Sequence, residues 1–130
     1  MLFRSIALGR LGGLTSSASD EILDDIDAAL RATLAVSVSG IDHLCCGNLG
    51  RAEVLLVAAQ RLARPEFAAV AARATAWVVR RARDTGAYNL FPEQPRDVYS
   101  PGLFQGTTGI GYQLLRQAAP TVVPSVLLLQ

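Results

Sequence analysis

The sequence predicts an all-α protein built from repeated helical hairpins. Apolar residues recur at helical rather than alternating spacing along most of the 130 residues, as at Ile22, Ile26 and Leu30. Two Gly-x-x-Gly turns, at residues 47–50 and 106–109, each lead directly into an apolar helical pattern. Repeated hairpins with their turns on one side imply either a solenoid or a closed ring of helices, in which ligands can converge on the face that carries the turns.

The composition is that of one small domain or of a piece of a larger one. Apolar residues make up 51%, charged residues 18%, and mean hydropathy is +0.32, so the helix faces are either buried efficiently or packed against further protein. The net charge of +1 does not indicate nucleic acid or an anionic membrane as a partner. No apolar run reaches the ~18–20 residues of a membrane helix, and Arg4 and Arg10 interrupt the first apolar stretch, unlike in a signal peptide. We therefore expect a cytoplasmic protein.

The first half of the chain predicts two helices. One covers residues 1–12 and stops at two consecutive glycines, and the other covers residues 20–38. The first turns of the second helix carry four carboxylates, those of Asp20, Glu21, Asp24 and Asp25. This cluster is either a metal or catalytic site or a solvated helix start. Carboxylates stabilise the positive end of the helix dipole, which favours the solvated helix start.

The second half predicts three more helices, over residues 51–63, 65–84 and 106–119. Pro65 separates the first two, because proline disfavours a helical conformation in the residue before it but suits the first turn of the next helix. Four arginines lie mostly on the polar side of the middle helix: Arg73, Arg80, Arg81 and Arg83. They either bind an acidic partner or form a solvated face near the helix C-terminus, where cations suit the dipole. We favour the solvated face.

Two irregular segments accompany these helices. Residues 85–105 form a loop that is long for a compact domain, and its aromatic residues either line a substrate site or plug the helix ends; they are Tyr88, Phe91, Tyr99 and Phe104. Prolines end the last helix, and the apolar tail at residues 126–129 is expected to be tucked into the fold.

The motif at residues 42–50 gathers the side chains that are best suited to bind a metal. Both cysteines of the protein, Cys45 and Cys46, are adjacent here, and the only histidine, His43, lies just upstream. Thiolates are strong zinc ligands and zinc is normally four-coordinate, so the pair either shares one ion with further ligands or consists of two small buried apolar residues. His43 is either a third ligand or a local hydrogen-bonding group. A disulfide between neighbours would close a strained small ring and would not staple a long loop.

A third, damaged copy of the repeat is present at the start of the chain. Ser5 falls where Gly50 falls and is followed by a similar helix, but Leu2 takes the place of Gly47. The positions equivalent to Cys45 and Cys46 fall at or before Met1. We therefore expect the chain to begin inside a repeat unit.

Residues 42–51, Asp-His-Leu-Cys-Cys-Gly-Asn-Leu-Gly-Arg, resemble the zinc-binding motif of the lanthionine synthetase C-like family. The Cys-Cys-Gly form resembles most closely a subset of the C-terminal cyclase domains of class II, bifunctional lanthipeptide (lantibiotic) synthetases. Residues 102–116 and 123–129 resemble the last repeat and the terminus of these enzymes, and residues 6–11 resemble the helix after their earlier Cys-x-Gly turn. Residues 1–130 are thus expected to be a C-terminal fragment of such a cyclase domain.

The resemblance implies a partial α/α toroid of about two to three helical hairpins, with zinc bound at one mouth. It implies that a peptide cysteine, held as a thiolate, adds to a dehydroalanine or dehydrobutyrine of a precursor peptide and forms a thioether ring. Cys45 and Cys46 match the second and third protein ligands. The first ligand and the residues that handle protons in the family would lie upstream of Met1, so the zinc site of this chain is expected to be incomplete and the chain inactive alone.

Two alternatives stay open at this stage. The chain is either one half of a split enzyme, whose partner chain supplies the rest of the toroid and of the zinc site, or a helical-repeat binding module that no longer needs metal.

Overall fold

The structure, a computed structural model, describes residues 2–15, 17, 19–91 and 99–128, with side chains from residue 7 onward. Within these ranges the chain is all-helical and contains no strand, which confirms the predicted fold class. The elements are α1 (Leu2–Gly12), α2 (Asp20–Ala35), α3 (Asn48–Arg61), α4 (Pro65–Thr85), α5 (Thr107–Ala118) and the short 3-10 helix η1 (Val126–Leu128). None of the described helices is long and apolar enough to cross a membrane.

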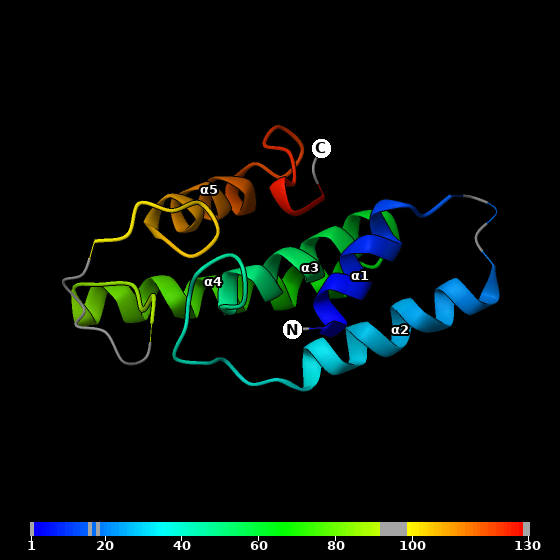
Figure 1. Ribbon diagram of the computed structural model, residues 1–130, viewed down its shortest axis with the longest axis horizontal. Helices are drawn as coiled ribbons and strands as arrows, with labels where there is room; N and C mark the ends of the chain where they lie inside the picture. Colours follow the sequence, from blue (N-terminus) through cyan, green and yellow to red (C-terminus); the bar gives the residue numbers. More distant parts are fainter. Residues whose placement is uncertain (1, 16, 18, 92–98, 129–130) are drawn as a thin grey trace.

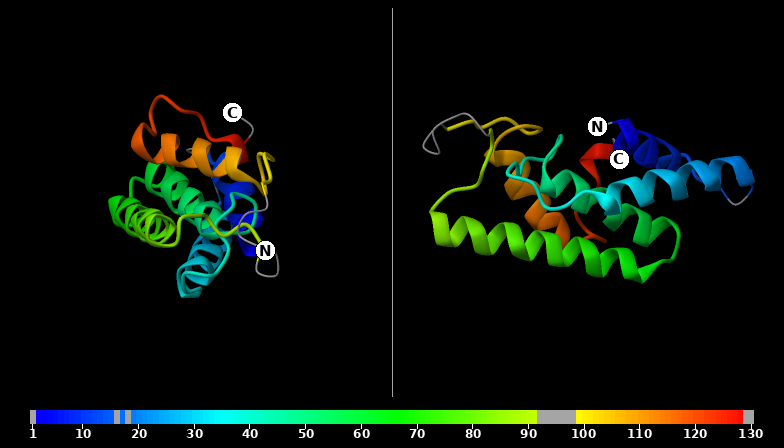
Figure 2. Two further views of the ribbon diagram at one scale, coloured as in Figure 1. Left: turned by 90° about the vertical axis from the view of Figure 1, so that its left-hand side faces the viewer. Right: turned by 90° about the horizontal axis from the view of Figure 1, so that it is seen from below.

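The helices form two hairpins and one further helix (Figure 1). Helix α1 packs against α2, and α3 packs against α4, while α3 also contacts both α1 and α5. We call α1, α3 and α5 the inner helices, and α2 and α4 the outer helices. Figure 2 shows the α1–α2 hairpin, the α3–α4 hairpin and α5 stacked in succession. This arrangement is consistent with part of a helical toroid.

Helix α2 ends earlier than predicted. The sequence pattern favours a helix up to residue 38, but α2 stops at Ala35 and Val36 is already extended, with φ −84° and ψ 120°. The Arg51 guanidinium accounts for this difference, because its Nη1 donates to the carbonyls of Val36 (2.8 Å) and Ser37 (2.6 Å). Side-chain donors thereby replace the helical partners of these two carbonyls.

The boundaries of α3 and α4 follow local chemistry. Helix α3 begins at Asn48, three residues before the predicted start, with Gly47 as the residue that precedes the first turn. Pro65 starts α4, as predicted, and Gly86 ends it in the left-handed conformation at φ 78°, which glycine adopts without steric cost.

The core lies between the hairpins. One apolar cluster joins α1, α2, α3 and the start of α4, and a smaller one joins Leu49, Val78, Leu90 and Ile110 beneath the Gly-rich turns. The described part of the tail, residues 126–128, is tucked in as predicted, because η1 contacts α1 and Leu128 packs on the larger cluster; residue 129 lies outside the described residues.

Candidate functional site

The two Gly-x-x-Gly turns have the same backbone structure. In the first turn the amide of Asn48 donates to the carbonyl of Ile41 at 2.8 Å, and in the second the amide of Thr107 donates to the carbonyl of Ser100 at 2.8 Å. In both bonds the donor follows the acceptor by seven positions, and the bond closes the turn directly before a helix. The sequence repeat is therefore also a structural repeat.

Glycine is required in both turns for the same steric reason. A Cβ added at Gly47 would lie 2.5 Å from backbone atoms of Asp42 and His43, and a Cβ added at Gly106 would lie 2.3–2.5 Å from backbone atoms of Ser100 and Gly102. The turns also touch each other, because the amide of Cys45 donates to the carbonyl of Phe104 at 2.8 Å. They therefore lie on one face of the molecule, as the repeat predicted.

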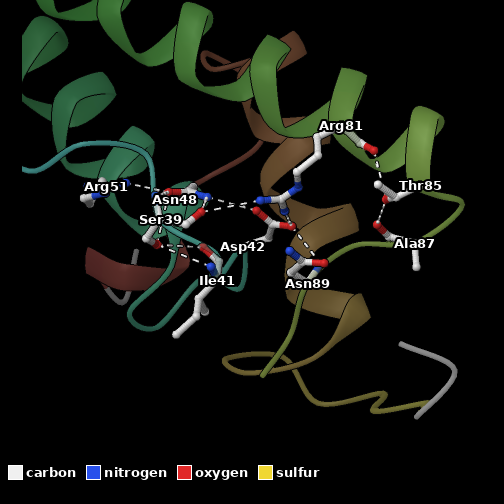
Figure 3. Close-up of polar contacts among 9 residues, drawn as sticks. All are labelled: Ser39, Ile41, Asp42, Asn48, Arg51, Arg81, Thr85, Ala87 and Asn89. Atoms are coloured by element: carbon white, nitrogen blue, oxygen red, sulfur yellow. Dashed lines mark hydrogen bonds and ion pairs between the residues drawn. The ribbon is translucent and has the colours of Figure 1, made fainter. Parts of the chain in front are cut away.

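Asp42 organises the first turn. Its side chain is fully buried and accepts from Asn48 Nδ2 (3.0 Å), from the Asn89 amide (2.8 Å) and from Arg81 Nη2 at short range (Figure 3). The Asp42 amide in turn donates to the carbonyl of Asn89 at 2.7 Å. Burying a carboxylate is costly unless it is paired and hydrogen-bonded, and this one has a cation and two further donors. The turn is thus tied to α4 and to the loop after α4.

Asn48 and Arg51 connect the same turn to the end of α2. Asn48 Nδ2 donates to the carbonyl of Ser39 at 2.9 Å, and the Ser39 amide donates back to Asn48 Oδ1 at 2.9 Å (Figure 3). Arg51 Nη2 also donates to Asn48 Oδ1, while its Nη1 binds the end of α2 as described above. Together with Asp42, these side chains fix the base of the turn from two sides.

The cysteine pair lies at the tip of this turn. The Sγ atoms of Cys45 and Cys46 are 3.2 Å apart, and both residues are half-buried. They therefore do not behave as two fully buried apolar residues. Among the residues that the structure describes, no group of three or more histidine, cysteine, aspartate or glutamate side chains is arranged to hold a metal ion.

His43 is buried beneath the cysteine pair. Its Nδ1 accepts from the amide of Cys46 at 3.3 Å, and its ring lies 5.8 Å from the ring of Phe91. Of the two roles considered for His43, this geometry matches the local hydrogen-bonding group, which supports the backbone of the second cysteine.

The acidic cluster of α2 occupies a helix start that is open to solvent. Asp20, Glu21 and Asp24 are exposed, and the half-exposed Asp25 pairs with Arg10 at 3.1 Å. The cluster is thus a solvated helix start, as predicted.

The arginines of α4 do not all behave as predicted. Arg73, Arg80 and Arg83 are exposed, but Arg81 is not part of a solvated face. It is half-buried, lies over the Trp77 ring at 4.8 Å and binds Asp42. The prediction was wrong here because Trp77 and Arg81 are one turn apart on α4, at the edge of its buried side. The aspartate that begins the motif, Asp42, was the available sequence signal that a cation would be needed nearby.

The four loop aromatic residues divide between two roles. Tyr88 and Phe91 pack against the apolar cluster beneath the turns, which makes them plugs of the helix ends. Tyr99 and Phe104 are 76% and 47% exposed, and Phe104 lies in the second turn, beside Cys45. Only these two are available to a ligand at the face that carries the turns.

A buried ion pair that the sequence did not reveal joins the two repeats. Glu53 on α3 accepts from Arg116 Nε and from Gln113 Nε2 on α5, each at 2.7 Å. All three side chains are buried, and Arg116 also binds the carbonyl of Val123 at 2.5 Å. The pair fixes α5, and with it the second turn, relative to α3. Its partners are 63 residues apart in sequence, so no local pattern indicates it.

Comparison with known families decides the assignment. The profile described as lanthionine synthetase C-like protein matches residues 4–128. The chain belongs to the lanthionine synthetase C-like family. Searches of curated proteins and of solved structures gave no significant match. Membership in the lanthionine synthetase C-like family supports a lanthipeptide cyclase-like function in general. It also suggests a peptide substrate for the intact family, whose members generally bind zinc.

Proposed function

We propose that this chain supplies two sulfur ligands, Cys45 and Cys46, to the zinc site of a lanthipeptide cyclase. The observation that carries the proposal is the position of the two thiols, 3.2 Å apart at the tip of a rigid turn. Family membership and the location of both repeat turns on one face support it. The Cys-Cys-Gly motif and the final Gly-rich repeat also favour the class II type of cyclase, with residues 1–130 as its C-terminal part.

The donor chemistry of the turn suits zinc only in part. Two thiolates are soft ligands of the kind that zinc prefers, but zinc is normally four-coordinate. The chain has no other cysteine, and His43 Nδ1 already accepts from the Cys46 amide. We therefore propose that the remaining ligands come from outside the described residues, one of them from the substrate thiol.

The proposed reaction joins a peptide cysteine to a dehydroalanine or dehydrobutyrine. The S–H bond is broken and the sulfur forms a bond to the β-carbon; the π electron pair of the carbon–carbon double bond moves to the α-carbon, which takes up a proton. Zinc, when bound, would keep the thiol deprotonated at neutral pH. Because both electrons come from the thiolate, the step needs no external oxidant or reductant.

The described residues around the pair hold it in place. Asp42, Arg81 and Asn89 fix the base of the turn, and His43 holds the amide of Cys46. A ligand pair on a preorganised turn loses less conformational entropy on binding than a pair on a mobile loop. These residues are positioning residues, and they do not contact the reacting atoms in the proposal.

Zinc binding tests the proposal directly. We expect the purified chain to take up about one zinc per molecule in equilibrium dialysis with added small thiol, and the Cys45→Ala/Cys46→Ala variant to lose this uptake. The matched control is Phe104→Ala/Gln105→Ala, which changes the equivalent positions of the second turn and should keep it. Equal zinc uptake by the cysteine-free variant would contradict the proposal.

A cyclisation assay separates the proposal from its alternatives. A dehydrated precursor peptide incubated with the chain alone should keep its alkylatable thiols, as measured by mass spectrometry after thiol labelling. Efficient ring formation would show that the chain needs no further ligands. Zinc uptake without ring formation favours a split enzyme or a part of a larger one, while a folded chain that takes up no zinc favours the metal-free binding module.

A further inference from the structure

The two thiols of the first turn are placed to react with each other as well as with a metal. Cys46 Sγ donates to Cys45 Sγ at 3.2 Å, and both residues are half-buried, so the pair is partly open to solvent. A disulfide bond is about 2.0 Å long. The two sulfur atoms therefore need to approach each other by only about 1.2 Å to become bonded, which small side-chain rotations can supply.

The backbone of the turn keeps the two sulfur atoms together. Successive side chains of an extended chain point to opposite sides, so a Cys-Cys sequence does not by itself bring two thiols into contact. Here the amide of Cys45 donates to the carbonyl of Phe104 at 2.8 Å. The amides of Cys46 and Gly47 donate to Nδ1 (3.3 Å) and to the carbonyl oxygen (2.9 Å) of His43. Three consecutive amides are thus held, and the thiols stay adjacent at the tip of the turn.

A disulfide between these two neighbours would be strained. Neighbouring Cα atoms are about 3.8 Å apart, whereas the Cα atoms of a disulfide-bonded pair are usually about 4.4–6.8 Å apart. Strained disulfides are readily reduced, and bonds of this kind are regulatory rather than structural. The bond would also close no long loop, so it would add little to the stability of the fold. These are the properties of a reversible switch.

We propose that Cys45 and Cys46 form a redox switch, in which hydrogen peroxide converts the two thiols into a reversible disulfide. One cysteine, as the thiolate, attacks a peroxide oxygen; the O–O bond breaks, and a sulfenic acid and hydroxide form. The second thiolate attacks the sulfenic sulfur; the S–S bond forms, the S–O bond breaks and a second hydroxide leaves. The two thiol protons convert both hydroxides to water, so two thiols and one peroxide give one disulfide and two water molecules.

The contact between the thiols decides which oxidation product forms. A sulfenic acid that has no thiol nearby is open to further oxidation to a sulfinic acid, which a small thiol does not reverse. With the second sulfur already in contact, closure of the disulfide is intramolecular and outpaces this further oxidation. A small thiol then reduces the disulfide by exchange and restores the pair.

The consequence for metal binding rests on the proposed zinc site. Zinc is bound by thiolates, and a disulfide between Cys45 and Cys46 removes both of them at once. Oxidation should therefore prevent the chain from taking up zinc, and reduction should restore the uptake. The switch would in this way couple the proposed cyclase chemistry to the presence of peroxide.

Mass spectrometry of the intact, chelator-treated chain tests the switch. After one equivalent of hydrogen peroxide, we expect the chain to lose the mass of two hydrogen atoms and both alkylatable thiols, and dithiothreitol to restore both. The matched controls, Cys45→Ser and Cys46→Ser, should form no internal disulfide and should give a sulfenic acid that dimedone traps. Dimedone should trap about tenfold less of the unsubstituted chain when it is folded than when it is unfolded in urea, because only the folded turn holds the second sulfur in contact.

Zinc dialysis of the same samples, without added thiol, separates the switch from the proposed zinc site. The oxidised chain should take up at least tenfold less zinc than the reduced chain, and dithiothreitol should restore the uptake. Oxidation to sulfinic acid, disulfides only between two chains, equal trapping in the folded and unfolded chain, or unchanged zinc uptake after oxidation would overturn the proposed switch. A reduced chain that takes up no zinc but forms the reversible internal disulfide would contradict the zinc site and support the switch.

Discussion

The turn at residues 41–50 and the turn at residues 100–109 have the same backbone structure but differ in their surroundings. Equivalent amides close both, and both need glycine where two backbone segments approach closely. The first turn is rooted in the interior, with Asp42, His43 and Leu44 buried, whereas the equivalent Pro101 and Gly102 are exposed. At the tips, Cys45 and Cys46 correspond to Phe104 and Gln105. Backbone geometry is therefore the common property of the repeat, and the metal-capable chemistry belongs to one copy.

The largest effect should come from removing the cation beneath the first turn. Arg81→Met leaves the fully buried Asp42 carboxylate without its ion-pair partner, and breaking a buried pair in this way costs about 3–5 kcal/mol. We expect the free energy of unfolding, measured by urea denaturation, to fall by at least about 3 kcal/mol. In hydrogen exchange the amide of Asn48 should lose protection before that of Thr107, because the residue equivalent to Asp42 in the second turn is the uncharged Pro101.

Arg73→Met is the control for this comparison. Arg73 is exposed on the same helix, so its replacement should change the free energy of unfolding by less than about 0.5 kcal/mol. A loss below about 1 kcal/mol for Arg81→Met would show that the pair is not what distinguishes the first turn.

Replacing the turn glycines should have the next largest effect, and it should be similar in the two copies. A Cβ at Gly47 or Gly106 would lie 2.3–2.5 Å from backbone atoms that cannot move aside without opening the turn. We expect Gly47→Ala and Gly106→Ala each to lower the free energy of unfolding by about 2–3 kcal/mol, as strongly overpacked sites do. Gly40→Ala, with nothing within 4 Å of the new Cβ, is the control. A large difference between the two variants would disprove the structural equivalence of the turns.

Moving the cysteine pair to the second turn tests whether the turn alone arranges the thiols, and it should change the free energy of unfolding less than the variants above. In a Cys45→Ala/Cys46→Ala chain, Phe104→Cys/Gln105→Cys places the pair at the exposed tip of the second turn. Because both positions are exposed, these two substitutions should change the free energy of unfolding by less than about 1 kcal/mol. If the turn alone arranges the thiols, dialysis with zinc and small thiol should show that uptake is restored. If uptake stays absent, the buried surroundings of the first turn are needed as well.

The smallest effect concerns an exposed ion pair, which contrasts with the buried one at Asp42. The hydrogen bond from Arg64 Nε, at 2.8 Å, lowers the pKa of the exposed Glu66 below its usual range. Because the folded pKa is the lower one, any stabilisation is present above the unfolded pKa of about 4.3 and is lost as the pH falls through the folded pKa. Arg64→Gln should return the Glu66 pKa towards the usual range in an NMR titration. An unchanged pKa would contradict this cause.

Most of the fold could be predicted from local patterns. Apolar spacing, Pro65, Gly86 and the Gly-rich turns act on neighbouring residues, so the helices were found with errors of only a few residues at their ends. The early end of α2 arose from Arg51, which lies 15 residues away from the carbonyl of Val36 that it binds. The candidate ligands Cys45 and Cys46 also followed from the sequence, and the zinc role assigned to them stays a prediction, as does a cytoplasmic location.

The sequence by itself determined the helical class, the repeat and the family, because periodicity, glycine placement and motif are properties of adjacent residues. Only the tertiary structure decided that Asp42 pairs with Arg81 and that Glu53 pairs with Arg116. The physical reason is that charge pairing and burial depend on residues that the chain brings together over 39 to 63 positions. No local pattern carries that information.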